Sequence, residues 1–234
     1  MKNLPRAVIA FFLIGVPCLL LIKGVYGSFL FSFSIPLFWQ VSFLGKPLSS
    51  LGLRTRSLAI SVFWGVVSGA LLGLLGGTIL RLFGLVNYSP DSAHRIQIEF
   101  GALSIDISLG KEFAYRLFTM SGSGAGLLLY VLFLIFVIGL GEELLWRGFI
   151  QRKIADRVTA DKAVWITAAL FSLTHIYLFL ILSAGRGILL LGMIGIAGAF
   201  WGYLYERTGN IWSVAVSHGI AAAFIWENFY TLPS

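Results

Sequence analysis

Long apolar runs separated by short polar segments dominate this chain and predict helices that cross a membrane. A membrane-spanning helix needs about 20 mostly apolar residues, whereas a transmembrane barrel alternates apolar and polar positions. The runs here are continuous, so we predict an all-α, polytopic transmembrane helix bundle of about seven spans. The predicted spans cover residues 7–22, 28–44, 58–86, 124–146, 163–181, 188–205 and 211–230.

Basic residues between the runs predict the orientation of the bundle. Residues 1–6, 45–57 and 147–162 are rich in Lys and Arg, which the positive-inside rule places in the cytoplasm. Three cytoplasmic segments require an even number of spans between them, and hence two short spans before residue 45 and a cytoplasmic N-terminus. We read the first run as a retained span, because no clear small-x-small cleavage site follows it. The predicted parts are an N-terminal membrane hairpin at 1–44 and a helical core at 45–234.

The longest polar stretch, residues 87–122, is expected on the outer face, because it lies between two predicted spans. Residues 95–100 and 103–108 alternate between polar and apolar side chains, which predicts a small β-hairpin. His94 belongs to this solvated stretch, and we give it no catalytic role.

The composition agrees with a multi-pass membrane protein, which we expect in the plasma membrane and surrounded by membrane lipid. Hydrophobic residues make up 58% of the 234 residues and charged residues only 12%. The net charge of +7 comes from basic residues in the loops that flank the runs, so it does not indicate a nucleic-acid partner. The single cysteine, Cys18, lies in an apolar run and cannot form an internal disulfide.

Two adjacent glutamates, Glu142 and Glu143, interrupt an apolar run, and Arg147 follows one helical turn later. A charged residue at membrane depth costs about 2.5–3.5 kcal/mol on insertion scales, so such residues are rare and usually functional. Glu143 and Arg147 are four residues apart and are predicted to form an ion pair on one helix face. Glu142 points about 100° away and is predicted to face another helix.

Two histidines, His175 and His218, also lie inside apolar runs. Counting about 1.5 Å per residue from the cytoplasmic turns places His175 level with Glu142, and His218 somewhat shallower. We expect the three side chains to converge in a site between helices that opens toward the cytoplasm. A carboxylate and an imidazole can activate water, and a second imidazole can stabilise an oxyanion or protonate a leaving amine. The same three residues are also a candidate set for a divalent metal such as zinc.

Three classes of function are compatible with these residues: an intramembrane endopeptidase, a membrane scaffold or immunity protein, and a proton-coupled transporter. The chain has neither the His-Glu-x-x-His motif of zincins nor the Gly-x-Ser-x-Gly motif of serine hydrolases. It also shows no clear internal repeat, which disfavours a transporter.

The motifs around these residues resemble the CAAX protease and bacteriocin-processing (CPBP, or Abi) family of intramembrane proteases. The family pattern is Glu-Glu-x-x-x-Arg, then Phe-x-x-x-His, then His-x-x-x-Asn/Asp. The segment Pro47–Arg54 and the residues after Arg147 also look like the family. The three blocks read Glu142-Glu143-Leu-Leu-Trp-Arg147, Phe171-Ser-Leu-Thr-His175 and His218-Gly-Ile-Ala-Ala222.

The resemblance implies a peptide hydrolase that acts on a prenylated or membrane-associated peptide, without a cofactor or with a divalent metal as the alternative. Glu142 would be the general base and His175 would assist it. Glu143 and Arg147 would hold the site together, and His218 would help stabilise the oxyanion.

The third block departs from the family pattern, because Ala222 stands where the family has Asn or Asp. Losing an oxyanion donor typically lowers the rate by about 100- to 1000-fold, so the resemblance also implies a slow or impaired enzyme. Ser217 and Thr174 are candidates to replace the lost donor. Asn228 lies about 15 Å past His218 along the helix, too far to do so.

Overall fold

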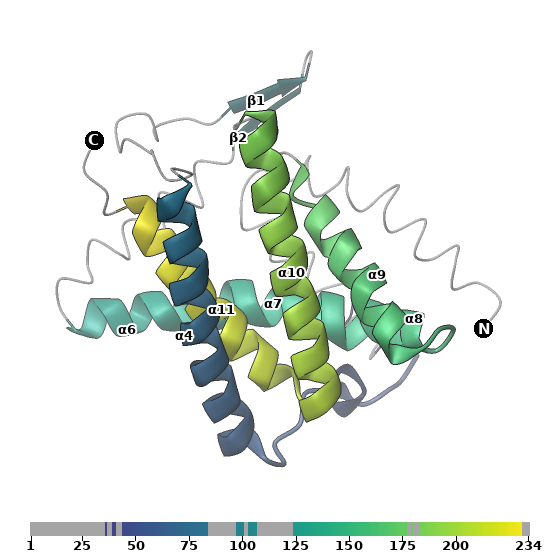
Figure 1. The fold of residues 1–234 in the computed structure, drawn as a ribbon. Helices are drawn as coiled ribbons and strands as arrows, with labels where there is room; N and C mark the ends of the chain where they lie inside the picture. Colours follow the sequence, from purple (N-terminus) through teal and green to yellow (C-terminus); the bar gives the residue numbers. More distant parts are fainter. Residues whose placement is uncertain are drawn as a thin grey trace.

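Helices make up almost all of the chain that can be described. The computed structural model describes residues 36, 39–40, 44–83, 97–100, 103–106, 124–176, 179 and 183–230. The helices α4, α10 and α11 run beside one another, and the helix that contains α6 and α7 crosses them (Figure 1). In chain order the elements are η3 (Leu48–Leu51), α4 (Leu58–Leu82), β1 (Gln97–Phe100), β2 (Leu103–Asp106), α6 (Gly124–Phe133), η6 (Leu134–Gly139), α7 (Leu140–Glu143), η7 (Leu144–Gln151), α8 (Arg152–Ala155), α9 (Ala160–Leu173), α10 (Ala184–Thr208) and α11 (Ile211–Tyr230).

Three helices in the described part are long and apolar enough to cross a membrane: Leu58–Leu82, Gly124–Ala155 and Ala184–Thr208. A shorter apolar helix covers Ile211–Ile225. These helices confirm the predicted all-helical membrane bundle. The predicted hairpin of spans at 1–44 lies almost wholly outside the described residues, so the count of seven spans stays a prediction.

The predicted span at 163–181 is too long at its C-terminal end, because α9 ends at Leu173. The Thr174 hydroxyl donates a hydrogen bond to the Phe171 carbonyl at 2.6 Å, and Nδ1 of His175 lies 3.1 Å from the same oxygen. Side chains that bind nearby backbone groups compete with the helical pattern and favour its termination. His175 therefore lies just beyond the end of α9, in a turn.

The hairpin predicted in the polar stretch is confirmed. Strands β1 and β2 pair antiparallel, with Ile98 opposite Ile105 and Glu99 opposite Ser104. Its position on the outer face stays a prediction.

The helix that carries the two glutamates runs without a break from Gly124 to Ala155, beyond the predicted span at 124–146. Two stretches of it, η6 and η7, are π-helical, and the single α-helical turn α7 lies between them. Short π-helical stretches inside α-helices occur frequently at functional sites.

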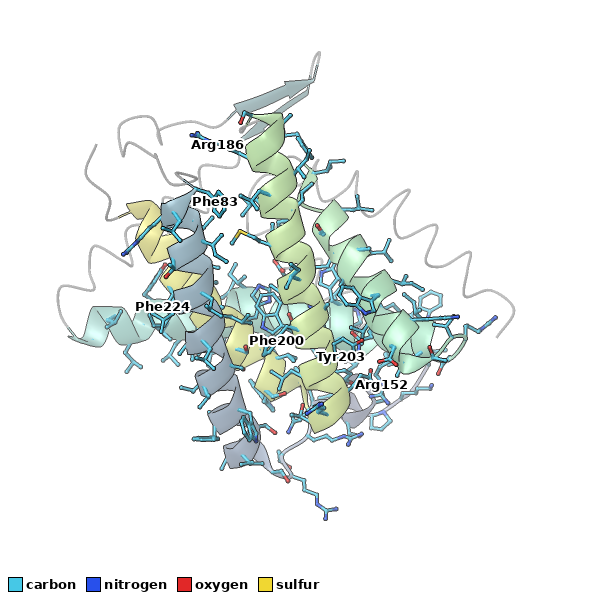
Figure 2. The ribbon with its side chains drawn as sticks, in the orientation of Figure 1. Phe83, Arg152, Arg186, Phe200, Tyr203 and Phe224 are labelled. Carbon is cyan, nitrogen blue, oxygen red and sulfur yellow. The ribbon has the colours of Figure 1, made fainter. Side chains whose placement is uncertain are left out.

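Helix α11 packs against α4 along a stripe of small residues. Large apolar side chains cover the outer face of α4, whereas its buried face consists of small residues. This is the reverse of a water-soluble helix and is the usual arrangement for helices that pack within a membrane. Phe224 of α11 lies against this face at Gly73 (Figure 2). The small buried residues of α4 are Ser61, Gly65, Ser68, Gly69, Gly73 and Gly77.

A short segment before α4 fixes where α11 begins. The Ile211 amide donates to the Gly52 carbonyl at 2.9 Å, and the Asn210 side chain donates to the Arg54 carbonyl at 3.1 Å. The Asn210 side-chain oxygen accepts from the Trp212 amide at 3.2 Å, which caps the helix N-terminus. Gly52 has φ +84°, a conformation that favours glycine. These contacts fix the position of α11 and of His218 along it.

We expect Gly69→Ala to lower the melting temperature of the protein in detergent. A Cβ at Gly69 would lie 2.7 Å from the Ser217 carbonyl oxygen and 2.9 Å from Cβ of Ile220, so α4 and α11 would have to separate. Overpacking of this kind typically costs about 1–3 kcal/mol. The matched control is Gly192→Ala in α10, where a Cβ meets no described atom within 4 Å. Equal melting temperatures for the two variants would contradict the close contact.

Candidate active site

The two glutamates occupy different surroundings although they are adjacent. Glu143 is completely buried, whereas the Glu142 side chain keeps 29% of its surface exposed. Because they lie in the α-helical turn α7, the two side chains point to different sides of the helix. Glu143 points into the bundle, and the Glu142 side chain keeps part of its surface uncovered.

Glu143 binds two partners with a single oxygen. Its Oε1 accepts a hydrogen bond from Nη1 of Arg147 at 2.8 Å, which confirms the predicted ion pair. The same oxygen lies 2.8 Å from Nδ1 of His218. A carboxylate paired with arginine only accepts hydrogen bonds, so Nδ1 of His218 carries the hydrogen, and Nε2 is left as the other reactive atom of the ring. Glu143 therefore orients a histidine on a different helix.

His218 and Glu142 face each other across the site. Nε2 of His218 lies 3.9 Å from Oε2 of Glu142. The shallower depth that residue counting predicts for His218 is wrong, because His218 contacts both glutamates. The contacts of Gly52 and Asn210 with the start of α11 set this depth, and residue counts do not contain them.

Arg147 is a fully buried cation held on three sides. Nη2 donates to the Gly198 carbonyl at 2.6 Å, and the guanidinium lies over the rings of Phe171 at 5.2 Å and Trp201 at 5.7 Å. Buried ion pairs need such further partners to offset the loss of hydration. Arg147 thereby joins η7 to both α9 and α10.

His175 approaches the same site from the end of α9. Nδ1 lies 3.1 Å from the Phe171 carbonyl, which can only accept, so this nitrogen is the donor. The Phe171 ring lies edge-on to both imidazoles, at 5.1 Å from His175 and 6.1 Å from His218. The structure thus brings His218 beside Glu142 and places His175 and His218 against the same Phe171 ring.

Trp201 is a part of the site that sequence reasoning missed. Its ring stacks on His218 with centroids 4.1 Å apart and an interplanar angle of 18°. Its Nε1 donates to the Ser217 hydroxyl at 3.1 Å, which lies 3.0 Å from the Ser68 hydroxyl, and Ser68 donates to the Trp64 carbonyl at 2.6 Å. This chain of hydrogen bonds fixes the plane against which the His218 ring rests. The signal available in the sequence was the position of Trp201 inside a glycine-rich apolar run, where a large aromatic side chain can pack between helices.

The two predicted substitutes for the missing oxyanion donor are both engaged elsewhere. The hydroxyl of Ser217 is buried between Trp201 and Ser68, and the hydroxyl of Thr174 donates to the Phe171 carbonyl. Ala222 is 8% exposed, one turn beyond His218 on α11. The Asn228 side chain lies outside the described part.

The residues predicted as alternative metal ligands are Glu142, His175 and His218. Among the residues described, no group of three or more His, Cys, Asp and Glu side chains is arranged to hold one. Nδ1 of His218 is bound to Glu143, and Nδ1 of His175 is bound to the Phe171 carbonyl. Metal-bound histidines commonly donate the second ring N–H to a carboxylate or a carbonyl in this way, so zinc held by Glu142, His175 and His218 stays an alternative. We derive no step through a metal.

Comparison with known proteins connects this geometry to a family. Residues 124–224 match the family described as Type II CAAX prenyl endopeptidase Rce1-like. No curated protein and no solved structure matches the chain. All five candidate residues lie within the matched range, whereas the segment Pro47–Arg54 that also resembles the family lies outside it.

Proposed function

We propose that this chain, whose residues 124–224 match the Rce1-like type II CAAX prenyl endopeptidase family, is a member of that family and an intramembrane endopeptidase. The three long apolar helices and the family together make it an integral membrane protein. The observation that carries the proposal is the pairing of a partly exposed Glu142 with His218, whose ring Glu143 orients from behind. A base, an oriented imidazole and an accessible space are the parts that peptide hydrolysis by water requires.

In this mechanism Glu142 is the general base. Its carboxylate takes a proton from a water molecule while the water oxygen bonds to the carbonyl carbon of the scissile peptide. His175 and His218 present their Nε2 atoms to the same space, where they stabilise the oxyanion when protonated. The proton then passes to the leaving nitrogen, the carbon–nitrogen bond breaks, and an acid and an amine are released.

Glu143 and Arg147 act as positioning residues. Glu143 holds Nδ1–H of His218 and stabilises the positive charge that the ring gains when Nε2 accepts a proton, as the buried carboxylate does in other carboxylate–histidine pairs. Arg147 balances the charge of Glu143, since both side chains are fully buried.

The proposed substrate is a prenylated or membrane-associated peptide, because the site lies within the apolar bundle and the matched family is named for prenyl-CAAX cleavage. We further propose that the site opens to the cytoplasm of a plasma-membrane protein with seven spans and a cytoplasmic N-terminus. In this arrangement residues 1–44 form a membrane hairpin beside the core at 45–234. The clustering of basic residues in 45–57 and 147–162 supports the orientation.

The test is cleavage by the purified full chain in detergent of a farnesylated peptide ending in a CAAX sequence, with the unprenylated peptide and a mixed membrane-peptide library beside it. We expect one new peptide terminus, detected by mass spectrometry, and preference for the prenylated form. Failure to cleave any of these peptides while the protein is folded would contradict the proposal.

Ala222 is the observation that favours a second function, a membrane scaffold or immunity protein that retains the fold with weak or no catalysis. Fold alone does not determine activity. A cellular function that survives Glu142→Ala would support this alternative.

We expect Ala222→Asn to raise kcat for peptide cleavage by about tenfold to a hundredfold. The asparagine amide would supply an oxyanion donor one turn from His218, and such donors contribute about 100- to 1000-fold where a site is built around them. Ala222→Leu is the matched control, since it adds a similar volume without a donor. Equal rates for the two variants would show that a missing donor does not limit this chain.

A further inference from the structure

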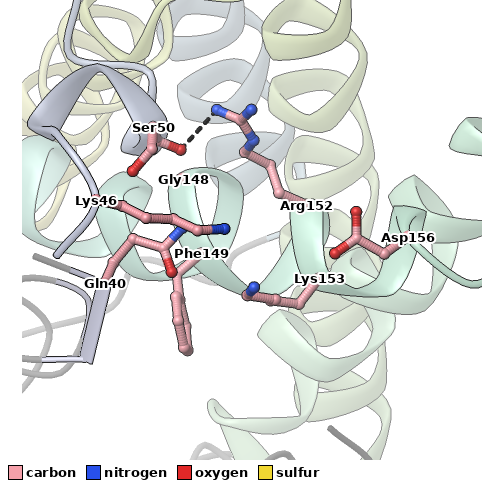
Figure 3. Close-up of a pocket in the computed structure, with 8 residues that line it drawn as sticks. All are labelled: Gln40, Lys46, Ser50, Gly148, Phe149, Arg152, Lys153 and Asp156. Atoms are coloured by element: carbon pink, nitrogen blue, oxygen red, sulfur yellow. Dashed lines mark hydrogen bonds between the residues drawn. The ribbon is translucent and has the colours of Figure 1, made fainter. Parts of the chain in front are cut away.

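A small polar hollow lies away from the candidate active site, between η3 and the end of the helix over Gly124–Ala155. Its volume is about 110 Å³. Figure 3 shows side chains from both elements around it, with the Lys46, Lys153 and Gln40 side chains directed toward a shared space. The residues that line it are Gln40, Lys46, Ser50, Gly148, Phe149, Arg152, Lys153 and Asp156.

The charge of this hollow is positive and largely uncompensated. Lys46, Arg152 and Lys153 face one acid, Asp156. Within the described part of the chain, neither lysine takes part in an ion pair. Nη1 of Arg152 donates to the Ser50 carbonyl at 2.7 Å and lies 3.4 Å from the Tyr205 hydroxyl, so its guanidinium is fixed at the wall. A preformed set of cations of this kind suits an oxyanion.

The hollow also contains acceptor atoms that lack a hydrogen-bond partner among the described residues. Gln40 is only 6% exposed, and its Oε1 and the hydroxyl oxygen of Ser50 are both buried without a partner. Unpaired buried polar atoms are costly, and each one calls for a ligand or an ordered water. An occupant that matches all of these groups carries a negative charge for the lysines and hydroxyl donors for the amide and hydroxyl oxygens.

The position of the hollow relative to the membrane indicates the source of such a ligand. Arg152 and Lys153 lie at the last turn of a helix long and apolar enough to cross the membrane, so the hollow lies where that helix leaves the hydrocarbon core. Neighbouring segments at the same end carry more positive charge, which attracts anionic lipids. These residues are Arg54, Arg56, Arg157, Lys162 and Arg207.

We propose that this hollow binds the headgroup of an anionic phospholipid whose phosphate carries a hydroxyl-bearing group, such as the glycerol of phosphatidylglycerol. The phosphate lies between the ammonium groups of Lys46 and Lys153, beside the guanidinium of Arg152. The headgroup hydroxyls donate to Gln40 Oε1 and Ser50 Oγ. The inference uses no residue of the proposed catalytic site and does not depend on peptide cleavage.

The test measures lipid binding to the purified full chain by native mass spectrometry, with phosphatidylglycerol and phosphatidylcholine as probes. We expect preference for phosphatidylglycerol, and a loss of about thirtyfold in the double variant Lys46→Gln/Lys153→Gln, since each basic residue near an anionic headgroup contributes about a factor of five. The matched control is Lys162→Gln/Arg207→Gln, which removes the same charge at the same end outside the hollow. It should change the affinity less than twofold.

Three outcomes would overturn the proposal. Equal binding of the two lipids would exclude an anion site. An equal loss in the control variant would show only a general attraction between the basic end and the lipid surface. Competition by soluble glycerol 3-phosphate at the same concentration as the lipid would identify a free phosphate compound, and not a lipid, as the ligand. The melting temperatures of both variants in phosphatidylcholine alone show whether each is folded.

Discussion

Glu142→Gln is expected to lower kcat for peptide cleavage by about a thousandfold, within the 10²- to 10⁴-fold range that general bases contribute. The amide keeps the shape of the carboxylate but cannot take a proton from water. The Glu142 side chain is 29% exposed and glutamine has nearly the same volume, so the substitution leaves the packing intact. The melting temperature should therefore change by no more than about 1–2 °C, as for other surface substitutions.

The matched control for Glu142→Gln is Asp161→Asn, which removes a carboxylate from the exposed first turn of α9. This variant should keep the full rate. A rate for Glu142→Gln within tenfold of that of the unmodified chain would remove Glu142 from the role of base. If the protein acts as a scaffold, its cellular function should survive in the Glu142→Gln variant even though peptide cleavage is lost.

Arg147→Met is expected to destabilise the protein by about 3–5 kcal/mol, because it leaves the buried Glu143 carboxylate without its cation. The variant also removes the donor to the Gly198 carbonyl and the cation between the rings of Phe171 and Trp201. Thermal unfolding in detergent measures the loss. If this variant expresses poorly, the double variant Glu143→Gln/Arg147→Met supplies the test.

The double variant should recover most of the stability, since it removes both charges and leaves an amide oxygen that still accepts from His218. Arg186→Met is the matched control. Arg186 is exposed near the start of α10, and it lies at the opposite end of the bundle from Arg152 (Figure 2). A loss no larger than that of the control would mean that the Glu143–Arg147 pair contributes little.

The membrane helices and the ion pair were predictable because they depend on local patterns. Apolar runs of sufficient length exclude other spanning structures, since every backbone polar group in lipid needs a partner within the helix. The spacing of Glu143 and Arg147 places them on one face of any helix, whatever surrounds it. The hairpin followed from alternation in the same way.

The glycine stripe of α4 was visible in the sequence but was not recognised. Gly65, Gly69, Gly73 and Gly77 recur every four residues, the spacing that marks one helix face. That signal predicts a close partner helix but does not say which one. The contact with α11 comes from the fold, and it places Ser68 beside Ser217.

The sequence by itself determined the class of the protein, the helix that carries the glutamates, and the residue types available for catalysis. Tertiary structure alone decided the second partner of Glu143, the position of His218 beside both glutamates, and the stacking of Trp201. Each of these depends on contacts between helices far apart in the chain, and the direction and depth of a side chain relative to another helix are set by packing. Local periodicity carries no information about them.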